Sequence, residues 1–195
     1  MTVHTTSTMP AQQSQATPGR NGKRVVSYPA PRSLATPTDL QANEVQAVVE
    51  ALNPLIADAY ALYVKTKNYH WHLAGSHFRD YHRLFDEQAD AVFASIDPLA
   101  ERVRRIGGMT IRSIGHIAQL QMIDDDNEDL VSPEVMIAHL IKDNLHMARQ
   151  LRAAIEACDR ARDAATSSIL ETILDETEKR VWFLFEISQG GEHME

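Results

Sequence analysis

The chain has 195 residues, of which 44% are hydrophobic and 24% charged, and its formal net charge is −8. This composition is ordinary for a globular protein, and the length suffices for one domain with a substantial core. A single cysteine, Cys158, excludes an intramolecular disulfide framework, and the first residues contain no apolar core typical of signal peptides. No stretch is expected to span a bilayer, so the sequence predicts a cytoplasmic protein with no membrane partner.

Charge is unevenly distributed along the chain. The four charged residues of segment 1–37 are all basic: Arg20, Lys23, Arg24 and Arg32. The segment therefore carries a charge of +4, which leaves −12 for the remainder of the chain. The segment also holds five of the eight prolines, and it buries too little apolar surface to offset the entropy cost of ordering it. The sequence therefore predicts a disordered basic tail over residues 1–37 and a folded domain over residues 38–195.

The first half of the folded part predicts two long helices. Over about residues 39–73, apolar residues recur at three- and four-residue spacings, which is typical of an amphipathic helix. Pro54 lies inside it and should kink it or make its first section ragged. Ser76 is a suitable N-cap for a second helix over about residues 77–105, which Gly107-Gly108 ends.

The second half predicts two more long helices after a long connection. Residues 109–131 form the connection, with a short helix near residues 111–120 and the acidic loop DDDNED. Ser132-Pro133 starts a third helix that extends to about Cys158, and a fourth covers about residues 167–188, before Gly190-Gly191. Four long helices, no strand signals and one long crossover between the second and third indicate an all-α four-helix bundle.

Four residues of the second helix share one stripe. These residues are His82, Asp86, Asp97 and Glu101. Since each residue of an α-helix is rotated by about 100° from the one before, all four lie within an arc of about 100° around the helix axis. The first two form an i,i+4 pair and so do the last two, so each pair can reach a common ion. The pairs cannot reach the same ion within one chain, since residues 86 and 97 lie roughly 16 Å apart at about 1.5 Å per residue.

That separation leaves two alternatives for the stripe. Either there are two half-sites, or a second copy of the helix lies antiparallel across a two-fold axis and brings the two pairs together. His70 can fold back beside His82, because Gly75 lies in the hairpin between them. Two imidazoles and up to three carboxylates suit Fe(II), and also Zn(II) or Mn(II).

Each of these residues also has an ordinary explanation. A single histidine is usually packed or solvated, and acidic stripes on helices are usually solvated faces. Here, however, five residues can be brought together in one arrangement of metal ligands, and this favours metal binding: His70, His82, Asp86, Asp97 and Glu101. His139, Asp143 and His146 share a face of the third helix and form a further candidate trio, whereas His72 and His77 lie off the stripe.

A motif of specific spacing covers residues 68–108. It contains Asn68-Tyr69-His70-Trp71, Gly75, Phe78, His82 and Asp86, then Ile96-Asp97, Ala100-Glu101-Arg102 and Ile106-Gly107-Gly108. This pattern resembles the Dps family, the DNA-binding proteins from starved cells, and its spacing extends over about residues 40–190. The resemblance implies a ferritin-like bundle assembled as a hollow dodecamer.

The resemblance also implies a site and an activity. The positions of His70, His82 and Asp86 would come from one subunit, and those of Asp97 and Glu101 from its two-fold mate. Such a protein would be a ferroxidase that oxidises Fe(II) with hydrogen peroxide. It would store Fe(III) as a mineral and so protect DNA from oxidative damage.

Other functions stay open at this point. A nucleoid-packaging protein would bind DNA without sequence preference through residues 1–37 and have little or no ferroxidase activity. A zinc-storing or purely structural bundle is a further alternative, whereas a conventional ferritin is disfavoured because the chain contains no Glu-x-x-His. Pro98 departs from the family pattern, and it should bend the helix by removing the hydrogen bond to the Ala94 carbonyl.

Overall fold

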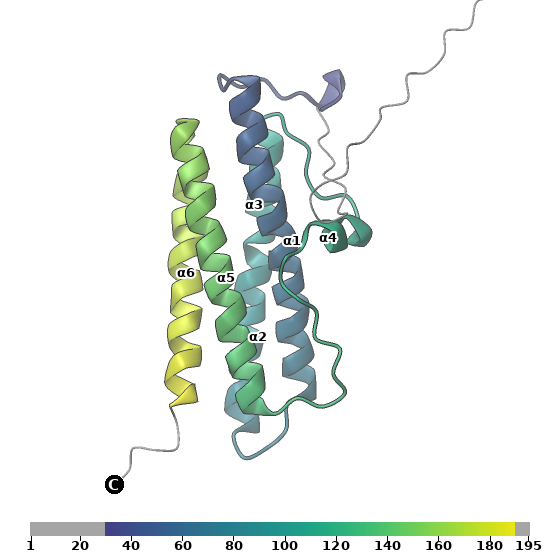
Figure 1. Ribbon diagram of the computed structural model, residues 1–195, viewed down its shortest axis with the longest axis vertical. Helices are drawn as coiled ribbons and strands as arrows, with labels where there is room; N and C mark the ends of the chain where they lie inside the picture. Colours follow the sequence, from purple (N-terminus) through teal and green to yellow (C-terminus); the bar gives the residue numbers. More distant parts are fainter. Residues whose placement is uncertain (1–29, 190–195) are drawn as a thin grey trace, which may run out of the picture.

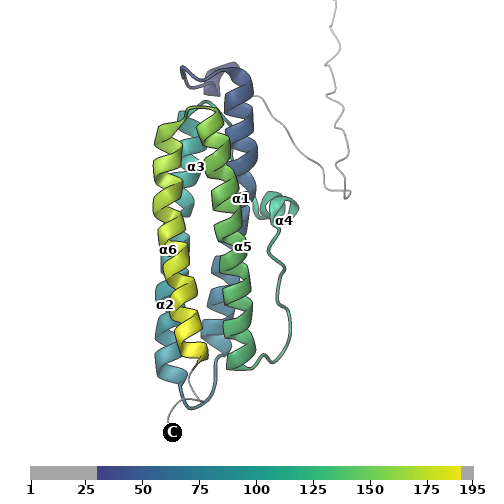
Figure 2. The same cartoon turned by 60° about the vertical axis from the view of Figure 1, so that its left-hand side comes forward.

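The computed structural model describes residues 30–189, and all regular structure within this range is helical. The elements are η1 (Arg32–Leu34), α1 (Ala42–His72), α2 (Phe78–Ala94), α3 (Ile96–Arg105), α4 (Ile114–Leu120), α5 (Pro133–Arg160) and α6 (Ala164–Ser188). Four rods run side by side, with α2 and α3 sharing one rod, and the crossover that carries α4 runs along the outside (Figures 1 and 2). The predicted all-α four-helix bundle is confirmed. The Gly190-Gly191 helix end and most of the predicted tail, residues 1–29, lie outside the described residues.

The two helical prolines act differently. Pro98 has no N–H to donate to the Ala94 carbonyl, and the predicted long second helix is accordingly divided at Ser95 into α2 and α3. Pro54, in contrast, lies inside α1, which is continuous from Ala42 to His72. The carbonyl that Pro54 leaves without a donor belongs to exposed Glu50, where water can replace the missing N–H.

Helix α1 contains a long apolar stretch. One of its windows is long and apolar enough to cross a membrane, with a mean hydropathy of 1.3. The expectation that no stretch would meet this test was therefore wrong. Half of that window is buried inside the bundle, and a core helix passes the same test, so the window is weak evidence for a membrane span.

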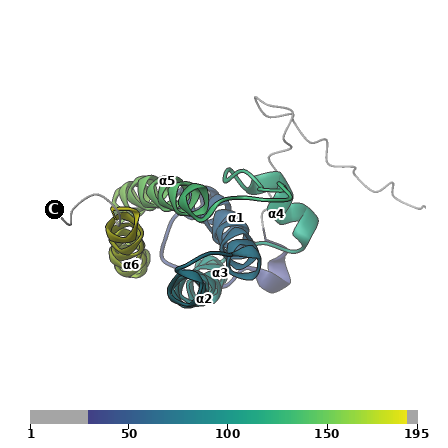
Figure 3. The same ribbon diagram turned by 90° about the horizontal axis from the view of Figure 1, so that it is seen from below.

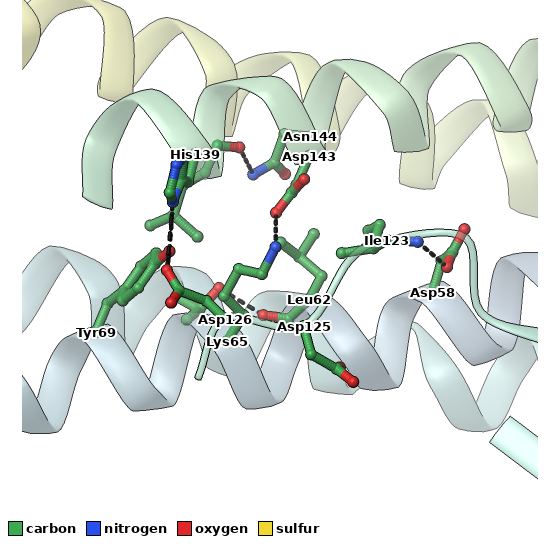
Figure 4. A network of polar contacts seen from close by, with 12 residues as sticks. Asp58, Leu62, Lys65, Tyr69, Ile123, Asp125, Asp126, His139, Asp143 and Asn144 are labelled. Atoms are coloured by element: carbon green, nitrogen blue, oxygen red, sulfur yellow. Dashed lines mark hydrogen bonds and ion pairs between the residues drawn. The ribbon is translucent and has the colours of Figure 1, made fainter. Parts of the chain in front are cut away.

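Polar contacts, one of them buried on both sides, fix the register between α1 and α5 (Figure 4). Three residues of α1 pair with three of α5 in reverse order. Asp58 contacts Gln150 at 2.6 Å. Lys65 contacts Asp143 at 2.6 Å and Tyr69 contacts His139 at 2.8 Å, as Figure 4 shows. Steps of seven and then four residues along α1 are matched by steps of seven and four backwards along α5. The two helices are therefore antiparallel, and a slip of one residue would break all three contacts at once.

The crossover between α3 and α5 is attached to α1 at two points (Figure 4). Asp58 is fully buried, and its Oδ1 accepts the backbone N–H groups of Met122 and Ile123 at 2.5 and 2.9 Å. Further along, the Tyr69 hydroxyl donates to the Asp126 carboxylate and holds the pKa of that group below its usual range. The long connection thus lies against α1 because carboxylates supply acceptors where backbone and phenol donors need them.

The ends of α3 and α6 are joined by a buried ion pair. Arg102 donates to Asp163 Oδ1 at 2.6 Å, and the same carboxylate caps α6 by accepting the Thr166 N–H at 3.1 Å. Cys158 lies nearby with no exposed surface, and burial raises the pKa of its thiol to about 12. This thiol is therefore a packing group rather than a reactive one.

Residues 30–37, the last part of the predicted tail, contact the end of α3. The Arg104 side chain donates to the Leu34 carbonyl at 2.6 Å. Gly107 has a φ of +84°, and a Cβ at this position would come within 2.8 Å of the Thr36 carbonyl oxygen. Glycine is needed there both for the left-handed backbone and for the close approach of the tail.

Replacing Asp58 should reveal how strongly the crossover is attached. Asp58→Ala should lower the free energy of unfolding by about 2–4 kcal/mol, because buried donors lose their acceptor. Asp58→Asn is the matched control, since its amide oxygen can still accept both backbone N–H groups, and it should cost markedly less. Chemical denaturation of both variants measures the difference, and equal losses would contradict the role given to this carboxylate.

Candidate metal centre

The hairpin between α1 and α2 brings the first group of predicted residues together. Gly75, with a φ of +121°, lies in the tight connection between the two helices. His70, which is 9% exposed, is in the last turn of α1, and His82 is in the second turn of α2. Because the helices pack against each other in opposite directions, residues on either side of the turn meet face to face (Figure 1).

The two histidines hold each other through their backbones. His70 Nδ1 lies 2.7 Å from the His82 carbonyl oxygen, and His82 Nδ1 lies 2.8 Å from the His70 carbonyl oxygen. A carbonyl can only accept, so both Nδ1 atoms carry the proton and donate. In the neutral ring this leaves the Nε2 lone pair of each histidine available to a metal ion, which is the arrangement that metal-binding imidazoles use.

Ring stacking fixes the orientation of this pair. The His70 and His82 rings stack with centroids 3.7 Å apart and planes at 19°. Phe78 stacks on His82 at 4.9 Å and 26°, so the His82 ring lies between two flat neighbours. The imidazoles are therefore preorganised rather than free to rotate.

Asp86 lies beside the histidines and carries an ammonium partner. Its Oδ1 is 3.8 Å from His70 Nε2 and accepts a hydrogen bond from Lys67 Nζ. The hydrogen bond from Lys67 holds the pKa of Asp86 below its usual range, and the same bond raises the pKa of Lys67. Lys67 also lies 3.8 Å from Asp90 Oδ1. Asp86 therefore already has a cationic partner within its own chain.

The other two predicted residues lie apart from this cluster. Asp97 and Glu101 are exposed on α3, and Glu101 pairs with Arg105 one turn further on. Within the described residues, no group of three or more His, Cys, Asp or Glu side chains is arranged to hold a metal ion in one chain. The structure thus brings together His70, His82 and Asp86, and it leaves Asp97 and Glu101 facing outward from the same rod.

The second candidate trio has a different explanation. His139 contacts Tyr69 and Asp126, Asp143 pairs with Lys65, and His146 lies 3.3 Å from Asp58. His139 and Asp143 make two of the contacts that set the α1–α5 register, and His146 lies beside the third, so their helical spacing reflects packing of α5 on α1. Of the histidines off the stripe, His72 is exposed and bonds its own helix.

Sequence reasoning missed Lys67 as a member of the cluster. The signal was present, because Lys67 precedes His70 by three residues and therefore lies on the same face of α1. Tyr69 was counted only as part of the motif, and nothing local in the sequence indicates that Asp126, far along the chain, would be its partner.

Comparison with known proteins identifies the family. The family model of the ferritin-like domain matches residues 49–193. A DNA protection during starvation protein of Brevibacillus brevis is 33% identical over 139 residues, covering 71% of this chain and 93% of that protein. The chain belongs to the Dps family. A low temperature-induced protein of Nostoc is 36% identical over 146 residues, covering 74% of this chain and 82% of that protein.

A solved structure agrees with this assignment. The Dps protein of Vibrio cholerae, described as a member of a broad superfamily of ferritin-like diiron-carboxylate proteins, superimposes with a TM-score of 0.74. It is 27% identical and covers 78% of this chain and 96% of its own. The fold predicted from the Dps resemblance is thus confirmed, while the roles of the five predicted site residues stay a prediction.

Removing Lys67 tests whether its ammonium competes with a metal ion. In the full-length protein, Lys67→Gln should tighten binding of Co(II), a spectroscopic substitute for Fe(II), by about two- to fivefold, because Asp86 loses its competing partner. Lys142→Gln, which removes an exposed lysine of α5, is the matched control and should change nothing. Visible absorption titrations give both affinities. Weaker Co(II) binding in Lys67→Gln would show that Lys67 supports the site instead.

Proposed function

We propose that this chain is the subunit of a homo-oligomeric ferroxidase and iron store of the Dps family. The observation that carries the proposal is the stacked pair of His70 and His82, whose Nδ1 atoms are both engaged by backbone carbonyls, with Nε2 of His70 3.8 Å from Asp86. Imidazole nitrogen and carboxylate oxygen together suit Fe(II), the substrate, better than they suit Mg(II) or Ca(II).

The site is completed by a second subunit. Asp97 and Glu101 are exposed and point away from the histidine cluster of their own chain, so a two-fold axis that sets two α2–α3 rods antiparallel supplies them to the partner's cluster. Every pair of subunits then forms two equivalent sites. A hollow dodecamer is the assembly that the family resemblance favours, and it gives the oxidised iron an enclosed space in which to be deposited.

The residues divide the chemical work between them. His70 and His82 bind and orient Fe(II), while Asp86, Asp97 and Glu101 supply negative charge that favours the higher oxidation state. Two Fe(II) ions lose one electron each, and one hydrogen peroxide takes both electrons with two protons to give two waters. Electrons and protons balance without release of a hydroxyl radical, which is how such a protein protects DNA.

DNA binding is a second candidate function, favoured by two observations. The relative from Brevibacillus brevis is named for DNA protection, and residues 1–37 carry +4 without any acidic residue. Repeated on every subunit of an assembly, this charge would bind phosphates through many weak contacts, against the opposing −12 of the remainder. On this proposal the protein is cytoplasmic and associates with the nucleoid.

Co-assembly of two inactive variants tests the shared site. One variant carries His70→Ala and His82→Ala, and the other carries Asp97→Ala and Glu101→Ala; each alone should lack fast Fe(II) oxidation. Unfolding and co-assembling them in equal amounts should restore about a quarter of wild-type activity. Half of random dimers are mixed, and one of the two sites in each is whole. Co-assembly of either variant with itself is the control.

The result of this mixing separates the alternatives. If all ligands came from a single chain, every chain would still lack half of its site, and mixing would restore nothing. Stopped-flow absorbance of Fe(III) formation after addition of hydrogen peroxide provides the measurement.

Neutralising the tail tests the DNA proposal. Arg20→Gln, Lys23→Gln and Arg24→Gln together keep the length of the tail and remove three of its four charges, and they leave residues 30–37 on α3. This variant should lose the DNA gel shift seen with the wild type at about 50 mM salt, while Fe(II) oxidation is unchanged. A wild-type protein that shifts no DNA under these conditions contradicts the proposal.

A further inference from the structure

A groove separates α6 from the rod formed by α2 and α3. Seen end-on, α1 packs on α2 and α5 packs on α6, and α6 faces the α2–α3 rod across the bundle (Figure 3). Between them lies a groove of about 430 Å³, whose walls include Ala91, Ala94, Ile169, Ile173, Glu176 and Arg180. This volume lies within the range of sites that bind small molecules.

The groove exists because its α2–α3 wall is made of small groups. Ala91 and Ala94 present only methyl groups, and Ser95 and Pro98, at the break between α2 and α3, continue this wall with small side chains. The opposite wall carries Ile169 and Ile173. Most of the groove surface is therefore apolar, with hydroxyl groups along it.

Arg180 lies at the groove as a buried cation without an acidic partner. Its side chain is 7% exposed, and burial lowers the pKa of its guanidinium to about 10, so it is still charged near neutral pH. Nε donates to Asn144 Oδ1 and Nη2 donates to Thr177 Oγ1, both at 2.8 Å. A guanidinium has five donors, and among the described residues Nη1 has no hydrogen-bond acceptor.

The acidic residues near the groove are already paired. Glu176 lies 3.7 Å from Lys179, and Glu87, in a smaller hollow that Arg180 also lines, pairs with Arg83 at 2.9 Å. Within the described residues neither carboxylate is at ion-pair distance from Arg180, although Glu176 attracts it through space. A buried charge with only neutral partners is costly, and a bound anion would offset that cost.

We propose that this groove binds a small amphipathic carboxylate, with its carboxylate on Arg180 and its hydrocarbon chain along the alanine and isoleucine walls. The Nη1 donors give the carboxylate a charge-assisted hydrogen bond. The chain buries apolar surface that the groove leaves exposed to water. Inorganic phosphate meets only the first of these requirements, and a neutral alcohol meets only the second.

Calorimetric titration of the full-length protein with sodium octanoate tests the proposal. Octanoate should bind, and affinity should rise by up to about fourfold for each methylene added from butanoate to octanoate. Octanol and inorganic phosphate should each bind at least about tenfold more weakly than octanoate. Phosphate that binds as tightly as octanoate would overturn the proposal, as would affinity that does not depend on chain length.

Two variants separate the charge from the groove. Arg180→Gln should weaken octanoate binding about tenfold or more, and an unchanged affinity would overturn the assignment of Arg180. Ala94→Leu places a larger side chain in the groove from an exposed position, and it should abolish octanoate binding. This second variant tests the proposal even if Arg180→Gln does not fold. Ala153→Leu, at an exposed site of α5 outside the groove, is its matched control and should bind octanoate normally.

Discussion

The register between α1 and α5 is the constraint on which the rest of the structure depends. Three polar residues of α1 meet three of α5 at matching steps of seven and four residues, in the order Asp58–Gln150, Lys65–Asp143 and Tyr69–His139. The Lys65–Asp143 pair is buried on both sides, so a shifted register would leave an uncompensated charge in the core. Apolar packing alone would tolerate several registers, whereas these pairs tolerate one.

The same helix positions the candidate metal site. With α1 held on α5, its other side receives α2, and the hairpin places the His70 and His82 rings in contact. The two histidines use their Nδ1 atoms to tie the helices together, which leaves the Nε2 atom of each ring for the metal ion in the site that we propose. The rigid helices also determine which of the predicted residues lie apart from the histidine cluster. Rise along the α2–α3 rod carries Asp97 and Glu101 away from the cluster, and only a neighbouring copy can bring such residues back.

Buried charges in this bundle fall into two kinds. Lys65 and Arg102 each have a carboxylate partner at 2.6 Å, and both pairs join elements that are distant in the chain. Arg180 is also largely buried, but it has amide and hydroxyl partners, and it lines the groove beside the helix break at Ser95. The first kind stabilises the arrangement of helices, and the second leaves binding capacity that the fold itself does not use.

Much of the architecture is determined by the sequence alone, because the signals are local. Apolar periodicity, Ser132-Pro133 at the start of α5 and Gly107 after α3 each act within a turn or two of their own position, and the helices follow them closely. The stripe of His82, Asp86, Asp97 and Glu101 is local in the same sense, since helical geometry fixes which residues share a face. Pro98 was expected to bend its helix. The break between α2 and α3 lies at Ser95, about one turn earlier, because Pro98 has no N–H to donate to the Ala94 carbonyl.

Only the tertiary structure decided which partner each polar residue has. His139, Asp143 and His146 have spacing that fits a metal site, yet each contacts a different residue of α1 or the crossover. Lys67 reaches Asp86 only because the hairpin closes, and Arg180 lacks a carboxylate only because of how α6 faces α2. Periodicity specifies the face of a helix on which a side chain lies, but the side chain opposite depends on how distant helices pack, which no local pattern encodes.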